Sequence, residues 1–550
     1  MRDIMILLAL TVIIFFAGNN ILPLTNPDEV FYAGTASEMA NHGTWVTPYI
    51  FGQPQFEKPI LTYDLIRIAF LMFGQTSFAA RFFPALFALL GVLSVYFLGR
   101  LLYADRRKAF MGAFVLMTSA FYIGMAKTVF TDMIFSVWIL LSLTAFYTSY
   151  IHPQHKRCGL LLFHIFAALA VLTKGPLGYL IPLATIILFL SCRGEQKFLH
   201  SKAFGFGVLI LILIALPWYL LMFNLYGNAF THEFFYNDHW RRLLTAEHSS
   251  NDSWYFYPGA MVGGMFPWMF ITLISLWQTI KAFYCKKPES FQQFLLIWIL
   301  VVLGIFEPAH SKLMSYILPL FPAMALLAGG YLVERSDKIK NVGWSEWATF
   351  GLFLLIPLAF PIFVMKYPMY LPSMLHLKLL AAIEILFLIL LFIFIYSKKI
   401  RWVLYSFGLQ VPLLLFLILT ASAHIKPYVS SQEAVEYLMH DRQIDGKIAA
   451  SKFFIRGVKY FSGKDVVLLN FSNSNFFSPH PVLELNTPAK LRDFLGKQPL
   501  IYAVINKHTW GELKDISKNN GFHTELLAQI GDAFVVEITL ISKVLPLLSA

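Results

Sequence analysis

Long apolar runs recur along most of this chain. Many approach the roughly 20 residues that cross the hydrocarbon core of a bilayer. They lie at residues 4–24, 79–102, 108–125, 131–150, 158–173, 177–193, 204–223, 258–281, 291–308, 313–333, 346–365, 377–396 and 402–424. The first run is long, has one arginine before it, and lacks an A-x-A-like cleavage site, so it is predicted to be a retained span rather than a signal peptide. The pattern predicts an α-helical polytopic membrane protein with about 13 transmembrane helices.

Basic residues occur in every second connection between these runs. Lys and Arg are retained on the cytoplasmic side of a membrane, so the alternation predicts the orientation of the chain. The basic connections are at residues 100–108, 156–157, 193–202, 281–287, 335–340 and 398–401. The N-terminus is then inside, and the loop 25–78, the loop 224–257 and the chain after about residue 425 are outside. The net charge of +12 reflects this inward bias and gives no argument for nucleic-acid binding.

The chain has three cysteines, Cys158, Cys192 and Cys285, all predicted near the cytoplasmic face. A disulfide framework is therefore not expected, and the outer portion is predicted to be held by packing alone.

Residues 426–550 have a soluble composition and predict a small α/β domain outside the membrane. The expected helices are Ser430–His440 and Pro488–Leu495, and the expected strands are Lys447–Phe453, Asp465–Asn470, Leu500–Ile505 and Ala533–Ile538. No glycine-rich phosphate loop is present in the sequence of this domain, so nucleotides are not expected as ligands. The apolar stretch 540–548 is too short to span a membrane.

The first predicted outer loop carries acidic residues at the edge of the first span. Asp28 and Glu29 follow Asn26-Pro27 where a lipid head group would arrive, and one carboxylate could serve as a general base. Asp28 could instead cap a helix over residues 30–41. Glu57 and Lys58 lie in the same loop before a proline, where a solvated turn is the simpler interpretation.

Two other outer turns carry opposite charges. Asp132 opens an apolar span, either as a reacting carboxylate or as a helix cap favoured by the helix dipole. Lys174 ends the span before Gly175-Pro176, and could hold a phosphate or satisfy the last carbonyls of its helix.

The loop 224–257 and the segment 310–316 add more ionisable side chains. Arginine is suited to bidentate phosphate contacts and neutral histidine to metal binding or proton transfer. An aromatic belt with snorkelling cations is the alternative for the loop, and solvation is the alternative for Lys312. The residues concerned are His232, Glu233, Asp238, His239, Arg241, Arg242, Glu247 and His248 in the loop, with Tyr257 at its end, and His310, Lys312 and Tyr316 in the second segment.

Together these segments resemble the lipid A 4-amino-4-deoxy-L-arabinose transferase family. This family belongs to the GT-C class of polyprenyl-phosphate-dependent glycosyltransferases, which includes protein O-mannosyltransferases. The resemblance covers about residues 1–330 and rests on Asn26-Pro27-Asp28-Glu29, Phe56-Glu57-Lys58-Pro59, Thr131-Asp132, Thr173-Lys174-Gly175-Pro176, His239-Trp240-Arg241-Arg242, Trp254-Tyr255-Phe256-Tyr257 and Ser311-Lys312 with Tyr316-Ile317-Leu318-Pro319. It implies a transmembrane glycosyltransferase domain over residues 1–425, juxtamembrane helices within the loop 25–78, and a periplasmic domain over residues 426–550.

The resemblance also implies roles for individual residues. Asp28 is the expected catalytic carboxylate, with Asp132 and Glu29 beside it. The expected lipid-phosphate and substrate ligands are Lys58, Lys174, Arg242 or the adjacent Arg241, Lys312, Tyr316 and Tyr257. Glu57 and His239 are expected as a metal-binding pair, for zinc or another divalent ion, although structural zinc usually has four ligands.

The implied reaction moves aminoarabinose from undecaprenyl phosphate to a lipid A phosphate on the periplasmic side of the bacterial inner membrane. Transfer of another polyprenyl-linked sugar to core oligosaccharide, or to protein Ser/Thr, is the first alternative. A transporter or flippase is the second, but transporters carry their charges near the midplane and show internal repeats, whereas these charges gather at one edge.

Overall fold

The computed structural model describes residues 1–245, 251–285, 289–338, 343–366, 374–420, 422–440, 442–472, 482–518 and 520–541. Glu247, His248 and most of the apolar stretch 540–548 lie outside these ranges. The chain packs as two compact units: Met1–Asn19, Phe56–Leu65 and Phe78–Thr420 form the first, and Asn20–Gln55, Ile66–Ser77 and Ala421–Ala550 form the second. The first loop therefore groups largely with the C-terminal chain, whereas the sequence placed all of residues 1–425 in one domain.

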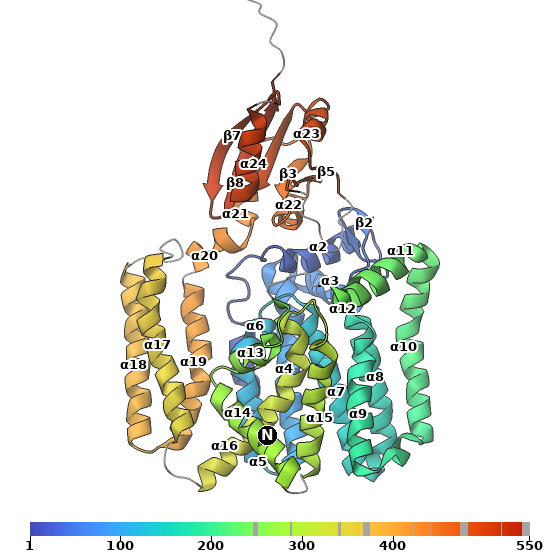
Figure 1. The fold of residues 1–550 in the computed structure, drawn as a ribbon, viewed down its shortest axis with the longest axis vertical. Helices are drawn as coiled ribbons and strands as arrows, with labels where there is room; N and C mark the ends of the chain where they lie inside the picture. Colours follow the sequence, from blue (N-terminus) through green and yellow to red (C-terminus); the bar gives the residue numbers. More distant parts are fainter. Residues whose placement is uncertain are drawn as a thin grey trace, which may run out of the picture. The chain divides into compact units, whose positions relative to one another are not determined.

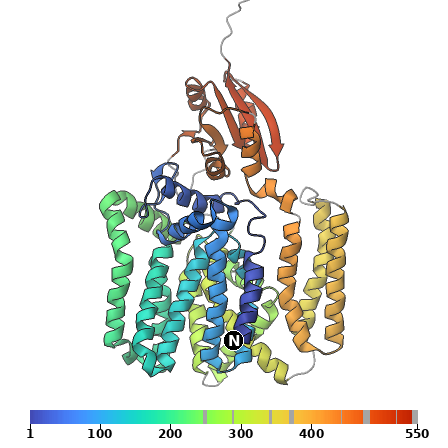
Figure 2. The ribbon, with the colours of Figure 1, turned by 180° about the vertical axis from the view of Figure 1, so that it is seen from behind.

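The first unit is a bundle of helices that run side by side (Figures 1 and 2). Each of the expected apolar runs contains helix, although the helix of the first run ends early, at Phe16. The helices are α1 (Arg2–Phe16), α4 (Ser77–Tyr103), α5 (Arg106–Met117), α6 (Ala120–Ala126), α7 (Thr131–Ile151), α8 (Lys156–Lys174), α9 (Leu177–Arg193), α10 (Lys202–Tyr226), α13 (Phe256–Gly264), α14 (Met269–Cys285), α15 (Ser290–Phe306), α16 (Phe321–Lys338), α17 (Trp344–Lys366), α18 (Met374–Tyr396) and α19 (Ile400–Thr420).

Short helices connect the long ones. The connection after α10 consists of α11 (Asn228–Thr231), a π-helix, η3 (His232–Arg241), and α12 (Arg242–Leu244), and a 3₁₀-helix, η5 (Met314–Leu320), leads into α16. Two further 3₁₀-helices, η1 (Pro153–His155) and η2 (Gln196–Leu199), lie at turns, and α3 (Leu61–Phe73) lies within the first loop, 25–78.

The helices have the length and composition of membrane spans. Within the described ranges, seven are long and apolar enough to cross a bilayer, and two bent pairs, α5 with α6 and α13 with α14, bring the number to nine. The pairs bend by 64° and 117°, while α9 and α15 are shorter apolar helices. The chain is therefore a multi-pass membrane protein, and the total of thirteen spans and their orientation stay predictions.

Large apolar side chains fill the interior of the first unit, and small residues bring its helices together. Trp268, Trp298 and Phe135 are almost fully buried. A Cβ on Gly329 of α16 would lie 2.3 Å from the backbone nitrogen of Gly112 on α5. Glycine thus lets these two helices pack closely, as small residues do between membrane helices.

The second unit contains a six-stranded sheet between two layers of helices (Figure 1). The strand order is β5-β4-β3-β6-β8-β7, in which β5, β4, β3 and β6 are parallel and β8 and β7 antiparallel to their neighbours. The helices α21 and α22 pack on one face, and α23 and α24 on the other. The bounds are α21 (Gln432–His440), β3 (Ile448–Ser451), α22 (Ile455–Ser462), β4 (Val466–Leu469), β5 (Glu484–Leu485), α23 (Pro488–Leu495), β6 (Leu500–Ile505), α24 (Lys507–Ser517), β7 (Phe522–Ile530) and β8 (Ala533–Leu540).

The sequence analysis found four of these strands and two of these helices, so the expected α/β fold is confirmed. It missed β5, β7, α22 and α24. Two residues of β5 are too few to show alternation, and β7 is an edge strand whose side chains are mostly exposed or half-buried.

The first loop contributes its own elements to the second unit. These are α2 (Asp28–Asn41) and the hairpin of β1 (Tyr49–Ile50) and β2 (Gln53–Pro54), and α20 (Ser422–Val429) leads into the C-terminal chain. The backbone nitrogen of Asn26 donates to the carbonyl of Val429, and the Arg456 guanidinium lies 4.4 Å from the ring centre of Phe31. Segments about 400 residues apart in sequence thus pack into one unit.

Candidate functional site

A group of buried charges lies at one end of the helices of the first unit. The Lys58 ammonium contacts Asp238 Oδ2 at 2.5 Å and also donates to the carbonyl of Glu57 at 3.0 Å. Asp238 Oδ1 lies 3.1 Å from Nε of Arg242. Because Asp238 is on η3 and Lys58 is in the first loop, this carboxylate joins segments far apart in the sequence.

Arg242 extends the group to η5. Its Nη1 donates to the hydroxyl of Tyr316 at 2.7 Å. The ring of Tyr316 in turn lies 4.2 Å from the ammonium of Lys174, measured to the ring centre. The contacts of Arg242 therefore lead into this group, and the choice between Arg242 and Arg241 as phosphate ligand stays a prediction.

Lys174 forms a short ion pair with Asp132 Oδ1. The helix dipole of α7 favours a carboxylate in its first turn, but α7 begins with Phe130 at the N-cap and no side chain caps it. Asp132 therefore serves as the partner of Lys174 rather than as the cap. Lys174 also interacts electrostatically with Lys58 and Asp238, so the two ion pairs form one cluster. We call Lys58, Asp132, Lys174, Asp238, Arg242 and Tyr316 the charged cluster.

The charged cluster holds three cations, Lys58, Lys174 and Arg242, against two carboxylates. The side chains of both carboxylates are 6% exposed. Burial opposes ionisation of Asp238, but Arg242 and Lys58 outweigh it and lower the pKa of this carboxyl to about 2. Among the six residues of the cluster, the cations thus outnumber the carboxylates by one in a place of low dielectric, which favours an anionic ligand.

His239 lies beside this cluster. Its Nδ1 is 2.7 Å from the carbonyl of Phe234, and burial lowers the pKa of the imidazole below its ordinary value. A Cβ on Gly175 would come within 2.8 Å of its Nε2, so only glycine leaves room for the ring. The ring is thus held neutral with Nδ1 as donor, which leaves the lone pair on Nε2.

The expected metal pair receives limited support from this geometry. Among the described residues, no group of three or more His, Cys, Asp or Glu side chains is arranged to hold a metal ion. The bond from Nδ1 of His239 to a backbone carbonyl is the orientation that metal-binding histidines commonly have. A role of Glu57 and His239 in metal binding stays a prediction.

Lys312 belongs to a neighbouring group. Its ammonium contacts Glu307 at 2.9 Å and the carbonyl of Ser253 at 3.0 Å, and lies 5.6 Å from the ring centre of Tyr257. Tyr257 and Tyr316 interact electrostatically, which connects this group to the charged cluster. Because Glu307 neutralises Lys312, this lysine adds little net charge.

Asp28 and Glu29 belong to the second unit and are described there. Glu29 is buried, and its Oε2 accepts hydrogen bonds from the backbone nitrogen and the hydroxyl of Thr25, both at 3.0 Å. It therefore fixes the entry into α2, and its expected role beside Asp28 stays a prediction. Asp28 is exposed in the first turn of α2, and Pro27, not Asp28, occupies the N-cap. The capping interpretation of Asp28 is thus not supported.

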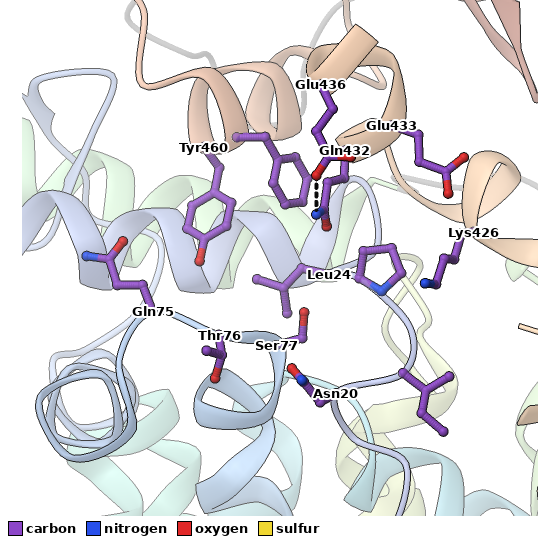
Figure 3. Close-up of a pocket in the computed structure, with 13 residues that line it drawn as sticks. Asn20, Leu24, Gln75, Thr76, Ser77, Lys426, Gln432, Glu433, Glu436 and Tyr460 are labelled. Atoms are coloured by element: carbon purple, nitrogen blue, oxygen red, sulfur yellow. Dashed lines mark hydrogen bonds between the residues drawn. The ribbon is translucent and has the colours of Figure 1, made fainter. Parts of the chain in front are cut away.

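The second unit also contains a polar pocket of about 520 Å³ (Figure 3). Tyr460 of α22 extends into it from one side, opposite Gln75 and Thr76, and Gln432 donates to Glu436 in its wall. Asn20, Ser77, Lys426 and Glu433 also line it. Burial raises the pKa of the Tyr460 hydroxyl to about 12, so the hydroxyl stays protonated and can donate. We call this the polar pocket.

The sequence analysis named Asp238 only among the ionisable residues of the loop 224–257 and gave it no role of its own, and it did not name Glu307. These two carboxylates hold the cations of the two groups. The spacing of Asp238 and Arg242, four residues apart, was the available signal, since residues at this spacing meet on one helical face. For Glu307 the spacing of five residues to Lys312 indicated nothing, because a turn between α15 and η5 brings the two together.

Replacing Asp238 with Asn tests whether this carboxylate holds the charged cluster together. Removal of one partner from a buried ion pair leaves uncompensated charge and costs about 3–5 kcal/mol. We expect a clear fall in the thermal unfolding temperature of the purified D238N protein. The matched control is D337N, because Asp337 pairs with the exposed Arg107, where about 0–1 kcal/mol is lost. Equal unfolding temperatures for the two variants would contradict the assignment.

Comparisons with known proteins agree with this architecture. The family model described as dolichyl-phosphate-mannose-protein mannosyltransferase (PMT) matches residues 1–231. An undecaprenyl phosphate-alpha-4-amino-4-deoxy-L-arabinose arabinosyl transferase of Pseudomonas fluorescens is 32% identical over 361 residues, covering 64% of each chain. One from Aeromonas hydrophila is 30% identical over 349 residues, covering 61% of this chain and 62% of the relative. The matched part thus spans somewhat less than two thirds of these relatives.

Solved structures extend the likeness of fold to nearly the whole chain. ArnT from Cupriavidus metallidurans bound to undecaprenyl phosphate has a TM-score of 0.77 at 19% identity, with 97% of each chain covered. The apo form of the same protein has a TM-score of 0.79. Sequence and fold together relate this chain to the undecaprenyl phosphate-aminoarabinose arabinosyl transferases and, more widely, to the GT-C glycosyltransferases that include the protein O-mannosyltransferases.

Proposed function

We propose that this chain is an integral-membrane glycosyltransferase that moves 4-amino-4-deoxy-L-arabinose from undecaprenyl phosphate to a phosphate of lipid A. The observation that supports this most is the charged cluster, a buried site with one excess positive charge at the end of membrane helices. Curated relatives named for undecaprenyl phosphate-aminoarabinose transfer support the choice of donor.

The charge of the cluster matches that of the proposed donor. A sugar linked to a polyprenyl phosphate is a phosphodiester with one negative charge, which equals the excess of the cluster. Lys58, Arg242 and the hydroxyl of Tyr316 supply donors within one connected group. Arginine and lysine at such a site bind phosphate through charge-assisted hydrogen bonds.

The same cations favour departure of the lipid phosphate. In a direct displacement, an oxygen of the acceptor phosphate attacks the anomeric carbon, and the bond from that carbon to the donor phosphate oxygen breaks. The electron pair stays on the lipid phosphate, which gains a second negative charge. Fixed cations stabilise such developing charge without reorganising. A single displacement inverts the anomeric configuration, and a covalent sugar adduct on Asp28 would contradict it.

Asp28 is the proposed catalytic carboxylate. A hydroxyl acceptor would need it as a general base, but a phosphate acceptor is already ionised at neutral pH. With lipid A, Asp28 would therefore orient the amine of the donor sugar by charge. Asp132 stays paired with Lys174 and keeps that ammonium against Tyr316.

A divalent metal held by Glu57 and His239 would add positive charge beside the donor phosphate. The neutral imidazole with its free Nε2 lone pair fits this role, but two protein ligands are fewer than most metal sites use. No step of the displacement depends on it. Activity measured with and without EDTA tests the requirement.

We propose that the polar pocket of the second unit binds the sugar of the acceptor. Its hydroxyl, amide, carboxylate and ammonium groups suit the many donors and acceptors of a saccharide, while Pro23 and Phe461 offer apolar surface. The segment 20–24, which forms one wall, is followed after three residues by Asp28. An acceptor held there would thus lie on the unit that carries the proposed catalytic carboxylate.

The alternation of basic connections supports the bacterial inner membrane as location, with the charged cluster facing the periplasm. Asp132 is in the first turn of α7 and Lys174 in the last turn of α8, and the other ends of these two helices meet at the basic connection 156–157, which fits this orientation.

The proposed function is tested by mass spectrometry of lipid A. The host makes undecaprenyl-linked aminoarabinose, lacks its own transferase, and expresses either this chain or the D28N variant. We expect the mass of aminoarabinose to be added by the native chain and about 10- to 100-fold less by D28N, because loss of a charge-assisted hydrogen bond to the sugar amine costs about 1.5–3 kcal/mol.

The control is labelling of Cys158 and Cys192, which are exposed. A membrane-impermeant maleimide should label them only after lysis of spheroplasts, for both proteins alike, which shows insertion in the predicted orientation. Unmodified lipid A with a correctly inserted native chain would contradict the proposed reaction. Labelled polyprenyl sugar found instead in core oligosaccharide or protein would identify the alternative acceptor.

Arg242 and Arg241 form a matched pair for the donor site. We expect R242K to lower affinity for undecaprenyl phosphate about 10- to 100-fold, because lysine cannot contact Asp238, Tyr316 and the phosphate in one plane. R241K should change it less than about threefold. Titration of the purified proteins with undecaprenyl phosphate measures both, and equal losses would contradict the assignment of Arg242.

The polar pocket is tested by separating the two substrates. We expect E433Q with Y460F to raise KM for the acceptor about tenfold, from the loss of hydrogen bonds worth about 0.5–1.5 kcal/mol each, and to leave donor affinity unchanged. E525Q, at an exposed position on β7 of the same unit, is the control. An unchanged acceptor KM in the double variant would rule out acceptor binding in the pocket.

A further inference from the structure

A second pocket, of about 430 Å³, lies at the other end of the helical bundle from the charged cluster. The direction follows from α16: Tyr316 comes just before its first residue, whereas Ser336, which lines the pocket, is in its last turn. The pocket is formed within the first unit by α1, α5, α16 and α19. In Figures 1 and 2 the start of the chain is at this end of the bundle.

Four arginines line the pocket: Arg2, Arg106, Arg107 and Arg401. Two of them are neutralised in the structure. Arg106 forms a two-point contact with Asp3, and Arg107 forms one with Asp337, at 2.8 and 3.0 Å.

The other two arginines keep an uncompensated charge. Arg2 and Arg401 are exposed, and neither has a hydrogen bond or ion pair to any residue that the structure describes. Arg2 is on α1 and Arg401 is on α19. The two residues are far apart in the sequence, yet they line the same pocket. The pocket therefore presents two guanidinium groups available for an anion.

Helix dipoles add to this positive potential. α1 begins at Arg2 and α19 at Ile400, so two N-termini lie at this pocket, whereas the N-terminus of α5 is capped by the Asp105 carboxylate. Each helix N-terminus carries about half a positive charge and unpaired N–H groups, which favours anions in the first turn. The C-terminal end of α16 also lies there, where Glu334 and Asp337 are paired with Lys108 and Arg107, and Arg335 is paired with Glu346.

The wall of the pocket is apolar. Ile6, Phe110, Met111 and Leu404 line it together with the ring of Tyr405. A surface that carries positive charge only because it faces the cytoplasm needs no such wall. Guanidinium groups above an apolar cleft between membrane helices match an amphiphile, with a phosphate at the rim and an acyl chain along the helices.

We propose that this pocket binds an anionic phospholipid, with its phosphate held by Arg2 and Arg401 and its acyl chain against α1, α5 and α19. We call it the lipid pocket. The lipid would connect the start of α19 to α1 and α5. Within the protein, α19 approaches α5 through side chains such as Tyr405, whose ring packs against that of Phe114. This proposal is independent of the transfer reaction, since no residue of the lipid pocket belongs to the charged cluster.

The experiment is native mass spectrometry of the full-length purified protein titrated with phosphatidylglycerol. The variant is R2Q with R401Q, and the matched control is R100Q with R157Q. Both control positions are exposed arginines in basic connections, outside the lipid pocket. Each cation near a membrane surface contributes about 1 kcal/mol to binding of anionic lipid, so each loss should weaken binding about fivefold.

We expect the R2Q/R401Q protein to bind phosphatidylglycerol about 20- to 30-fold more weakly than the native chain, and the control double variant to change it less than threefold. Phosphatidylcholine with the same acyl chains should bind the native chain no better than it binds the R2Q/R401Q protein. Equal binding of phosphatidylglycerol by the native chain and R2Q/R401Q would overturn the proposal.

A soluble anion is separated from a lipid by adding inorganic phosphate. For a lipid pocket, millimolar phosphate should not displace phosphatidylglycerol, because the apolar wall contributes to lipid binding only. Displacement at that concentration would show a site for free anions and would overturn the assignment of a lipid. Phosphatidylglycerol should also raise the thermal unfolding temperature of the native chain and of R100Q/R157Q, but much less that of R2Q/R401Q.

Discussion

Charge buried between helices must be compensated, and this requirement organises the first unit. Moving an ion away from water costs several kcal/mol even after the protein relaxes, so a buried ammonium or carboxylate persists only with a partner. Asp238 supplies that partner for Lys58 and Arg242, and Asp132 supplies it for Lys174. These ion pairs hold four segments together: the part of the first loop before α3, the π-helix η3, and the ends of α7 and α8.

Among the six residues of the charged cluster, cations outnumber carboxylates by one, and the proposed donor site depends on this difference. A fully neutral set of ion pairs would not attract an anion. Burial of several cations without partners would cost too much desolvation energy. One excess positive charge beside a phenol suits a phosphodiester and suits its leaving phosphate even better. The same arrangement thus explains why the site is stable without substrate and why it would favour transfer.

The two ends of the helical bundle use positive charge differently. At the charged cluster, the cations are buried, paired and held by side chains from several helices. At the lipid pocket, Arg2 and Arg401 are exposed and border an apolar wall. The first arrangement suits a reacting phosphate whose charge changes, and the second suits a lipid that stays bound. The basic connections that alternate along the sequence include those at the end of the bundle that holds the lipid pocket, not those at the end that holds the charged cluster.

The sequence by itself determined the membrane class, the positions of the apolar helices and the α/β character of the C-terminal chain. It also selected Lys58, Lys174 and Arg242, which the structure brings into one cluster and whose roles stay predictions. These follow from local properties, namely apolar length, alternation and charge at helix ends. Only the tertiary structure decided which charges pair. Asp238 was given no role and Glu307 was not named, because their partners come from a distant loop or across a turn. The contact of Arg242 with Tyr316 likewise depends on the direction of one side chain. The grouping of residues 20–55 with the C-terminal chain was likewise hidden, because backbone contacts such as Asn26 with Val429 leave no periodic pattern in the sequence.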